Sequence, residues 1–285
     1  MSVPVNELIG AIEEKFPLHL QENWDSSGWQ IALPPVEGGV SRILVALEIT
    51  REIIAEAKDL GAELIVEHHP LMFGKLANID ATASAPGPEG AYIAALIESG
   101  ISVYAAHTTF DTADGGMNDA LASALGLTGV KGFPSAAGAG ALGLPDGAED
   151  GDGGKWIHPI GRKGSLPAPV SFGVMAREAA GIFGMEGRLK TIGDPEATVR
   201  TVALCGGAGG DFVTDAIKEG VDLYITSDVK HHEAQWAREK GLMLIDGGHW
   251  GTEKIFVPEM AKFLREKFGD SVEIRESRAN QDPWR

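Results

Sequence analysis

Six side chains of this sequence are candidates for metal chemistry because each follows a strand-like apolar segment. They are His68, His69, His107, Asp111, His249 and Glu253. Histidine nitrogens and carboxylate oxygens bind zinc, manganese, iron or nickel, and this set is large enough for two ions. Open α/β sheets hold their ligands at the carboxyl ends of parallel strands, where these residues are expected. The first hypothesis is therefore a binuclear metal site on an α/β sheet.

The neighbours His68 and His69 favour two ions over one. Adjacent side chains of an extended strand point to opposite faces, so both imidazoles cannot readily bind the same ion. Pro70 takes the chain out of the strand and loosens that geometry, which leaves a shared ion open. Any single histidine has a simpler explanation as a buried structural side chain or a solvated loop residue. That explanation does not extend to all the positions together.

The motif histidine-x3-carboxylate occurs twice, as His107 with Asp111 and as His249 with Glu253. Residues four apart share one face of a helix, so each pair would lie side by side if its segment is helical. A carboxylate that bridges two metal ions holds them about 3.5–4 Å apart. Either Asp111 or Glu253 could be that bridge.

The remaining histidines receive different interpretations. We expect His232 to act beside a metal ion, by orienting a ligand or transferring a proton, and not to bind the ion itself. For His231, a surface position at the start of a helix is an equal alternative. His19 and His158 have no acidic or histidine neighbour at ligand spacing and are interpreted as structural.

Strand-like apolar runs alternate with amphipathic helical patterns along most of the chain. The runs are 43–47, 64–66, 101–104, 170–174, 202–205, 223–225 and 242–245. Strands separated by helices of this length predict βαβ units and a largely parallel sheet. The predicted fold class is therefore α/β, with mostly parallel strands.

The two halves of the chain resemble each other. Residues 57–66 align without gaps on residues 216–225, and both segments comprise a helix end, a glycine and the next strand. The histidine-x3-carboxylate motif recurs downstream in both halves. These matches indicate an internal duplication, with similar α/β lobes at 1–130 and 196–285. Between them, 131–195 is typical of a glycine-rich linker with connecting strands and a helix.

The composition excludes several classes of protein. The chain has 285 residues, a net charge of −17 and a single cysteine, Cys205. Strong acidity argues against nucleic acid or an anionic membrane as the partner, and no apolar run is long enough to span a bilayer. One cysteine excludes an intramolecular disulfide framework. Because the N-terminal residues also lack a signal-peptide pattern, we expect a cytoplasmic protein.

The glycine-rich segment 205–210 follows a strand and precedes a helix, a position where backbone amides can bind an anion. It matches neither the dinucleotide fingerprint nor the P-loop pattern, so a tight turn is the better interpretation. Cys205 has no paired base in the sequence and is expected to pack in the core.

Taken together, these motifs resemble the Nif-three-like dinuclear metal-centre family, often labelled GTP cyclohydrolase I type 2 homologs. The match covers nearly the whole chain except about 129–194. Its pieces are Glu22–Gln30, Glu67–Leu71, Ala106–Asp111, Cys205–Gly210, Tyr224–Asp228 with His232, and Asp246–Glu253. Two positions depart from the pattern, since Ser227 stands where glycine is more usual and Trp29 replaces a leucine. Neither is a ligand position.

The resemblance implies two similar three-layer α/β/α lobes, a toroidal homohexamer and two divalent ions, of Zn, Mn, Fe, Ni or Co. Transferred by motif position, the ligands of one ion would be His69 and Asp111, those of the other His68 and His249, and Glu253 would be the bridge. The catalytic residues beside the ions would be His107 and His232.

The leading functional hypothesis is a metal-dependent hydrolase. Two ions lower the pKa of bound water and polarise a carbonyl or phosphoryl oxygen, and His232 or His107 would transfer the proton to the leaving group. The family label suggests ring opening of GTP, while hydrolysis of another cyclic amide or of a phosphoester would use the same residues. The alternative is a non-enzymatic hexameric assembly that stores or delivers metal or regulates a partner. An enzyme needs an open coordination position, whereas a storage site can be closed.

Overall fold

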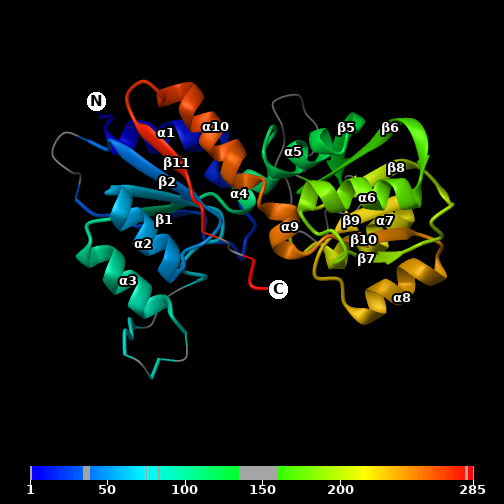
Figure 1. Cartoon of the computed structure of the whole chain (residues 1–285), viewed down its shortest axis with the longest axis horizontal. Helices are drawn as coiled ribbons and strands as arrows, with labels where there is room; N and C mark the ends of the chain where they lie inside the picture. Colours follow the sequence, from blue (N-terminus) through cyan, green and yellow to red (C-terminus); the bar gives the residue numbers. More distant parts are fainter. Residues whose placement is uncertain are drawn as a thin grey trace. The chain divides into compact units, whose positions relative to one another are not determined.

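The structure is a computed structural model that describes residues 2–34, 39–74, 76, 78–82, 84–85, 87–134, 159–279 and 282–284. It forms two compact units, Met1–Ala113 with Phe256–Arg285, and Asp114–Ile255. Each unit contains one β-sheet with helices packed against it (Figure 1). The predicted α/β fold class with two lobes is therefore confirmed.

The sheet of the first unit has the strand order β1-β4-β3-β2-β11. These strands are β1 Gly28–Ile31, β2 Arg42–Ala46, β3 Leu64–Glu67, β4 Ser102–Ala105 and β11 Glu273–Glu276. Parallel pairing joins β11, β2, β3 and β4, and only the edge strand β1 is antiparallel to its neighbour. The carboxyl ends of β2, β3 and β4 therefore lie along one edge of this sheet.

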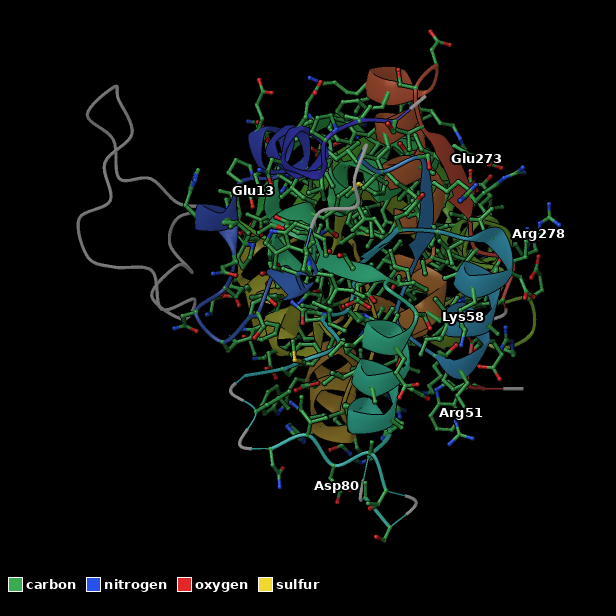
Figure 2. All side chains as sticks on the ribbon, turned by 90° about the vertical axis from the view of Figure 1, so that its left-hand side faces the viewer. Glu13, Arg51, Lys58, Asp80, Glu273 and Arg278 are labelled. Carbon is green, nitrogen blue, oxygen red and sulfur yellow. The ribbon has the colours of Figure 1, made fainter. Side chains whose placement is uncertain are left out.

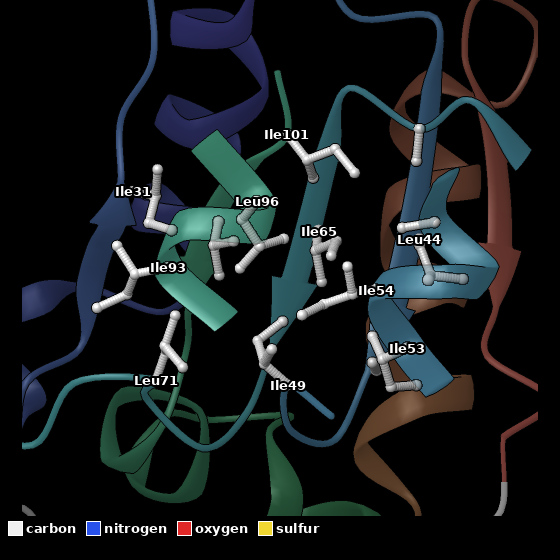
Figure 3. Close-up of a cluster of buried hydrophobic side chains, with 14 residues drawn as sticks. Ile31, Leu44, Ile49, Ile53, Ile54, Ile65, Leu71, Ile93, Leu96 and Ile101 are labelled. Carbon is white, nitrogen blue, oxygen red and sulfur yellow. The ribbon is translucent and has the colours of Figure 1, made fainter. Parts of the chain in front are cut away.

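The helices of the first unit cover its sheet. They are α1 Val5–Lys15, the 3-10 helix η1 Leu18–Leu20, α2 Arg51–Leu60, α3 Glu89–Glu98, α4 Thr108–Thr112 and α10 Phe256–Phe268. Figure 3 shows Ile53 and Ile54 of α2 packed with Ile65 of β3 and Leu96 of α3 in one apolar cluster. Alternate strand residues point to opposite faces, so the neighbours Leu64 and Val66 are buried on the other face of β3.

Helix α2 illustrates why these elements form where the sequence predicts them. Ile53, Ile54 and Ala57 are buried on one side, while Arg51 and Lys58 extend outward from the unit (Figure 2). The Thr50 hydroxyl caps the first turn by accepting a hydrogen bond from the backbone N–H of Ile53 at 3.2 Å. None of the helices in the described residues is long and apolar enough to cross a membrane.

The sheet of the second unit has the order β5-β6-β8-β9-β10-β7. Its strands are β5 Thr128–Phe133, β6 Gly161–Ser171, β7 Lys190–Ile192, β8 Thr198–Leu204, β9 Leu223–Thr226 and β10 Met243–Asp246. Only β8, β9 and β10 are parallel to one another, while β5, β6 and β7 pair antiparallel. The parallel arrangement expected from the sequence thus dominates the first sheet but forms only the centre of the second.

The helical elements of the second unit are α5 Met117–Ala124, α6 Phe172–Phe183, η3 Gly210–Phe212, α7 Val213–Glu219, α8 His231–Glu239 and α9 His249–Glu253. Tyr224 and Leu244 of the sheet and Cys205, which directly follows β8, form one core with Ala216 of α7 and Ala237 of α8. Cys205 is therefore a buried core residue, as the sequence predicted.

The predicted duplication appears in the topology of the two sheets. The order β2-α2-β3-α3-β4-α4 in the first unit is repeated as β8-α7-β9-α8-β10-α9 in the second. The helix ends match as well, because Gly61 and Gly220 are left-handed with φ of 66° and 64°. The residue after each glycine donates its backbone N–H to the aligned alanine, Ala57 or Ala216.

The chain is divided differently from the predicted ranges 1–130, 131–195 and 196–285. Helix α10 and strand β11 belong to the first unit, where β11 pairs with β2. Residues 161–192 of the expected linker form β6, α6 and β7, and these strands extend the second sheet. Local periodicity identifies a helix or strand but not the sheet edge that it joins. The glycine-rich stretch 135–158, including His158, lies outside the described residues.

Candidate metal centre

Three histidines gather at the carboxyl ends of β3 and β4 in the first unit. His68, His69 and His107 each offer one ring nitrogen, and these three nitrogens lie within 4.8 Å of one another. The backbone N–H groups of His68 and His69 both donate to the carbonyl of Leu47, at 3.0 and 2.8 Å. The end of β3 is thus fixed against the segment that follows β2. This spacing suits one shared ion as well as two ions about 3.5–4 Å apart.

His68 is oriented as a metal ligand would be. Its side chain is fully buried, and Nδ1 lies 3.0 Å from the carbonyl oxygen of Ala106. A carbonyl oxygen only accepts hydrogen bonds, so Nδ1 carries the proton and donates it. The lone pair is then on Nε2, which lies 3.6 Å from Oδ1 of Asp111. Fixing one ring nitrogen to a carbonyl is how proteins commonly orient a metal-binding imidazole.

Asp111 is positioned by the short helix α4, which begins directly after His107. The backbone N–H of Asp111 donates to the carbonyl of His107 at 3.1 Å, so the predicted helical spacing of this pair is present. Neighbouring Phe110 anchors the helix in the core, with its ring 4.7 Å from that of Phe16 and 4.9 Å from that of Phe256. The carboxyl group of Asp111 is buried beside His68.

A buried carboxylate holds His107. Oδ1 of Asp25 lies 2.8 Å from Nδ1 of His107, and the Asp25 side chain is fully buried. Asp25 also accepts hydrogen bonds from the hydroxyls of Ser27 and Thr108, at 2.6 and 2.5 Å. Burial alone would raise the pKa of Asp25, but the hydrogen bonds and charge of His107, with those two hydroxyls, lower it well below its usual range. Asp25 is therefore a stable anion that orients the imidazole.

Two further carboxylates lie close to this group. Oε2 of Glu48 is 3.7 Å from Nδ1 of His69. Glu67, the last residue of β3, is fully buried, and its Oε1 accepts the backbone N–H of Leu71 at 3.0 Å. Burial raises the pKa of Glu67 well above its usual value, an effect that the hydrogen bond from Leu71 only partly offsets.

The second unit contains the other histidine-x3-carboxylate helix, α9. Nε2 of His249 lies 3.0 Å from Oε2 of Glu253, so the predicted helical spacing brings these two side chains together. On the other side of the ring, Nδ1 of His249 lies 2.6 Å from Oδ2 of Asp228. Asp228 has a φ of 54°, a left-handed conformation that side-chain-bearing residues rarely adopt. Such strained positions cluster at functional sites.

The glycine-rich turn 205–210 supports Glu253. Gly207 has a φ of 65°, and a Cβ at this position would overlap Oε1 of Glu253. The backbone N–H groups of the turn are used by side chains, since Gly206 donates to Asn118 at 2.8 Å and Gly207 to Thr252 at 3.0 Å. The segment is the predicted turn, and its amide groups stabilise the protein's own loop.

The remaining histidines lie elsewhere. His232 is exposed at the start of α8, with its ring 5.1 Å from that of Trp236 and Nε2 4.0 Å from Glu233. His231 is exposed beside it, and His19 is exposed in η1. The structure thus groups His68, His69, His107 and Asp111 in the first unit, and His249 with Glu253 in the second.

Sequence reasoning assigned no role to three residues of these groups. Asp25 and Asp228 each hold Nδ1 of a candidate histidine, and Gly207 leaves the space that Glu253 fills. Asp228 could have been found, because gap-free extension of the repeat alignment sets it opposite His69. Asp25 lies outside the repeated segments, and only tertiary folding brings it to His107.

Both groups fit a divalent metal ion by their donor chemistry. Imidazole nitrogens with an orienting partner and buried carboxylates are ligands for zinc, manganese, iron, cobalt or nickel. Pairing of Nδ1 with a carboxylate or carbonyl, as for His68, His107 and His249, is the usual arrangement around metal-binding histidines. The residues present can therefore hold a metal ion.

Known proteins are similar to this chain over nearly its whole length. A Streptomyces coelicolor protein named GTP cyclohydrolase 1 type 2 homolog is 34% identical over 285 residues, which cover 98% of this chain and 93% of that protein. A Clostridium perfringens protein of the same name is 32% identical, with 98% of both chains covered. The crystal structure of a Bacillus cereus protein related to NIF3 aligns with a TM-score of 0.82 and 26% identity over 98% of both chains.

A Staphylococcus aureus hypothetical protein of known structure shares the fold, with a TM-score of 0.83 at 23% identity over 100% of this chain and 99% of that one. The family model described as Duf34/NIF3 (NGG1p interacting factor 3) matches residues 3–283. With nearly its whole length matched, the chain belongs to the Duf34/NIF3 family.

Proposed function

We propose that this protein is a metal-dependent hydrolase whose centre binds two divalent ions. The observation that carries the proposal is that both histidine-x3-carboxylate helices have the same design. In each, an aspartate holds Nδ1 of the histidine, Asp25 for His107 and Asp228 for His249. A purely structural histidine does not need such a partner in both repeats, whereas a ligand or a proton-transfer group does.

The proposed ligand sets follow the sequence motifs. His69 and Asp111 would hold one ion and His68 and His249 the other, with Glu253 as the ligand common to both. When bound, two such ions lower the pKa of water and polarise the oxygen of the bond to be cleaved.

His107 is the proposed proton-transfer residue, with His232 as a second one. Because Asp25 accepts the Nδ1 proton of His107, Nε2 is the nitrogen that can take a proton from the attacking water and pass it to the leaving group. The buried Asp25 anion stabilises the imidazolium that this transfer creates. The relatives' name includes GTP cyclohydrolase, and a cyclic amide or phosphoester of a small molecule is the substrate class that we propose.

We also propose a homo-oligomer, a hexamer, as the working form of the protein. Size-exclusion chromatography with light scattering measures the mass of the assembly directly. A mass near six chains is expected.

Metal analysis combined with activity measurements tests the proposed function. Wild-type protein loaded with Zn, Mn, Fe, Co or Ni should retain about two ions per chain and hydrolyse a nucleotide, a phosphodiester or a cyclic amide. Glu253→Ala should lose both the ions and the activity, while Glu239→Ala, which changes an exposed carboxylate in the same unit, should keep both. His107→Ala should keep the ions and lose activity.

The outcomes separate the hydrolase from its alternative. Two ions in the wild-type protein without hydrolysis of any of these substrates would support a metal-storage or regulatory assembly. Wild-type protein that retains no metal would exclude both functions.

A further inference from the structure

Two exposed aromatic side chains contact His107 on the first unit. The exposed fraction of Trp24 is 59% and that of Phe73 is 58%. The ring of Trp24 lies 5.7 Å from the His107 ring at 76°, and the ring of Phe73 lies 5.6 Å from it at 83°. Single exposed apolar side chains are ordinary on protein surfaces. Two large rings placed edge-on against the same imidazole are a specific arrangement.

The segments that carry these rings are tied together by hydrogen bonds. The backbone N–H of Gly74 donates to the Ser26 hydroxyl at 3.0 Å, and that of Met72 donates to Oε1 of Gln30 at 3.0 Å. Gln30 in turn donates its side-chain amide to the carbonyl of Ser26 at 2.7 Å. The residues on both sides of Phe73 are thus fixed to the segment that follows Trp24. A binding surface fixed in this way loses little conformational entropy when a ligand arrives.

Both rings are accessible to a ligand, because each remains more than half exposed. An exposed aromatic face can stack on a planar ring at about 3.5–4.0 Å.

The chemistry of His107 indicates a ring that carries hydrogen-bonding atoms. Asp25 accepts the proton of Nδ1, so Nε2 is the ring nitrogen that remains for a ligand. Such a nitrogen accepts a hydrogen bond from a ring N–H or an exocyclic N–H. A hydrocarbon surface offers no such donor. The edge contacts of Trp24 and Phe73 with His107 bring stacking and this hydrogen bond to one place.

We propose that Trp24 and Phe73 form a subsite that stacks a planar heteroaromatic ring of a small-molecule substrate beside His107. This subsite specifies the substrate class of the proposed hydrolase, and its role in catalysis depends on that proposed function. Binding of the ring itself requires neither metal nor hydrolysis, so it can be tested separately.

A matched contrast is present in the second unit. Trp236 has an exposed fraction of 47%, and its ring lies 5.1 Å from that of His232. His232 is itself exposed, and its carboxylate neighbour Glu233 is 4.0 Å from Nε2. Trp236 therefore shares the exposure and the histidine contact of Trp24, but its histidine is 4.0 Å from the buried Glu233 carboxylate, whereas His107 is 2.8 Å from Asp25. Ile79, which is 56% exposed, is the corresponding apolar control for Phe73.

The test measures binding of inosine and of ribose to the full-length protein after removal of metal with a chelator. Isothermal titration should show binding of inosine and none of ribose. Trp24→Ala and Phe73→Ala should each weaken inosine binding at least fivefold, the effect of losing one stacking partner. Trp236→Ala and Ile79→Ala should leave the dissociation constant within twofold of that of the wild type.

Three results would overturn the subsite. The first is that the wild-type protein does not bind inosine, and the second is that all four variants bind it with equal affinity. The third is that Trp24→Ala or Phe73→Ala weakens binding only when the oligomeric mass of the variant changes as well. The last result would give these rings a role between subunits. Inosine binding that depends on both rings in a protein without hydrolytic activity would keep the subsite and reject the hydrolase. Hydrolysis without ring binding would reject the subsite alone.

Discussion

The two repeats share a scaffold down to individual hydrogen bonds, yet their strand ends carry different chemistry. Glu63, just before β3, accepts the backbone N–H of Arg42 at 2.8 Å, and Asp222, at the same place before β9, accepts that of Thr201 at 2.8 Å. Each acidic residue directly precedes one parallel strand and is hydrogen-bonded to the neighbouring strand, to Arg42 of β2 or to Thr201 of β8. The contact joins equivalent positions of neighbouring strands in both repeats.

The carboxyl ends of the same strands differ. After β3 the chain presents His68 and His69, whereas the aligned positions after β9 are Ser227 and Asp228. In the first repeat the end of the strand supplies imidazoles directly. In the second, Asp228 orients an imidazole that comes from α9, at 2.6 Å from His249. Equivalent strand ends of the two repeats therefore carry different side chains, imidazoles in the first and an orienting carboxylate in the second.

The aspartate that holds the histidine is also buried to a different extent in the two units. The side chain of Asp25 is fully buried against His107, while the side chain of Asp228 is 53% exposed beside His249. A buried, fully hydrogen-bonded carboxylate contributes to folding, whereas an exposed one does so only weakly. The first unit should therefore couple its site to the stability of the fold, and the second unit should not.

Substitution of Gly207 should have the largest effect on the second repeat. In Gly207→Ala the new Cβ would displace Glu253, and the φ of 65° adds strain of about 1–2 kcal/mol. We expect metal affinity to fall about 10–100-fold, the range seen when the residues around a metal ligand are lost. Competition with a chelator measures the affinity, and urea unfolding measures the stability.

Gly220→Ala is the matched control, since Gly220 has a φ of 64° with nothing within 4 Å of a Cβ. It should lose similar stability, about 1–2 kcal/mol, and keep its metal. Equal metal affinity in the two variants would show that Gly207 is needed only for its backbone conformation.

The pair Asp25→Asn and Asp228→Asn tests the contrast in burial. Asparagine at position 25 places an amide N–H₂ against donors such as Thr108, so we expect a loss of about 2–3 kcal/mol in the free energy of unfolding. Asparagine tolerates the left-handed conformation of Asp228, and this exposed change should alter stability by less than about 0.5 kcal/mol. Asp228→Asn should instead weaken metal binding about tenfold or more.

Both variants are measured by urea unfolding without metal and by chelator competition. A larger loss of stability in Asp228→Asn than in Asp25→Asn would reverse the comparison between the two repeats.

The sequence predicted those features that local patterns determine. Apolar periodicity located β3 and α2, the spacing of His249 and Glu253 predicted a shared helical face, and the gap-free repeat alignment predicted the matching caps at Gly61 and Gly220. These features depend on residues close together in the chain, so one segment contains the whole signal.

Features that depend on distant segments were not predictable in this way. The pairing of β11 with β2 joins Glu273 to Arg42, which are far apart in the chain, and the contact of Asp25 with His107 spans 82 residues. No local pattern distinguishes Asp25 from an ordinary loop carboxylate. The mixture of parallel and antiparallel strands in the second sheet was not predictable for the same reason. The sequence of one strand does not determine the direction of the strand beside it.

The smallest expected effect concerns the scaffold contact that the repeats share. Burial alone would raise the pKa of Asp222, but hydrogen bonds from the backbone and hydroxyl of Thr201 and from the backbone of Arg200 lower it below its ordinary value of 3.8. An acid whose pKa is lower in the folded state stabilises the protein above its unfolded pKa. That stabilisation is lost as the pH falls through the folded pKa. Asp222→Asn should therefore cost about 1 kcal/mol at neutral pH, since the group is partly exposed.

The difference in unfolding free energy between the wild-type protein and Asp222→Asn should shrink as the pH falls below about 4. Urea unfolding at pH 7, 4 and 3 measures it. Thr201→Val is the companion variant, because it removes one donor to the carboxylate and keeps the charge. Its cost should be smaller than that of Asp222→Asn at pH 7. If the difference in unfolding free energy stays constant from pH 7 to pH 3, the charge of Asp222 does not stabilise the sheet. The contact shared by the two repeats would then stabilise it through packing and uncharged hydrogen bonds alone.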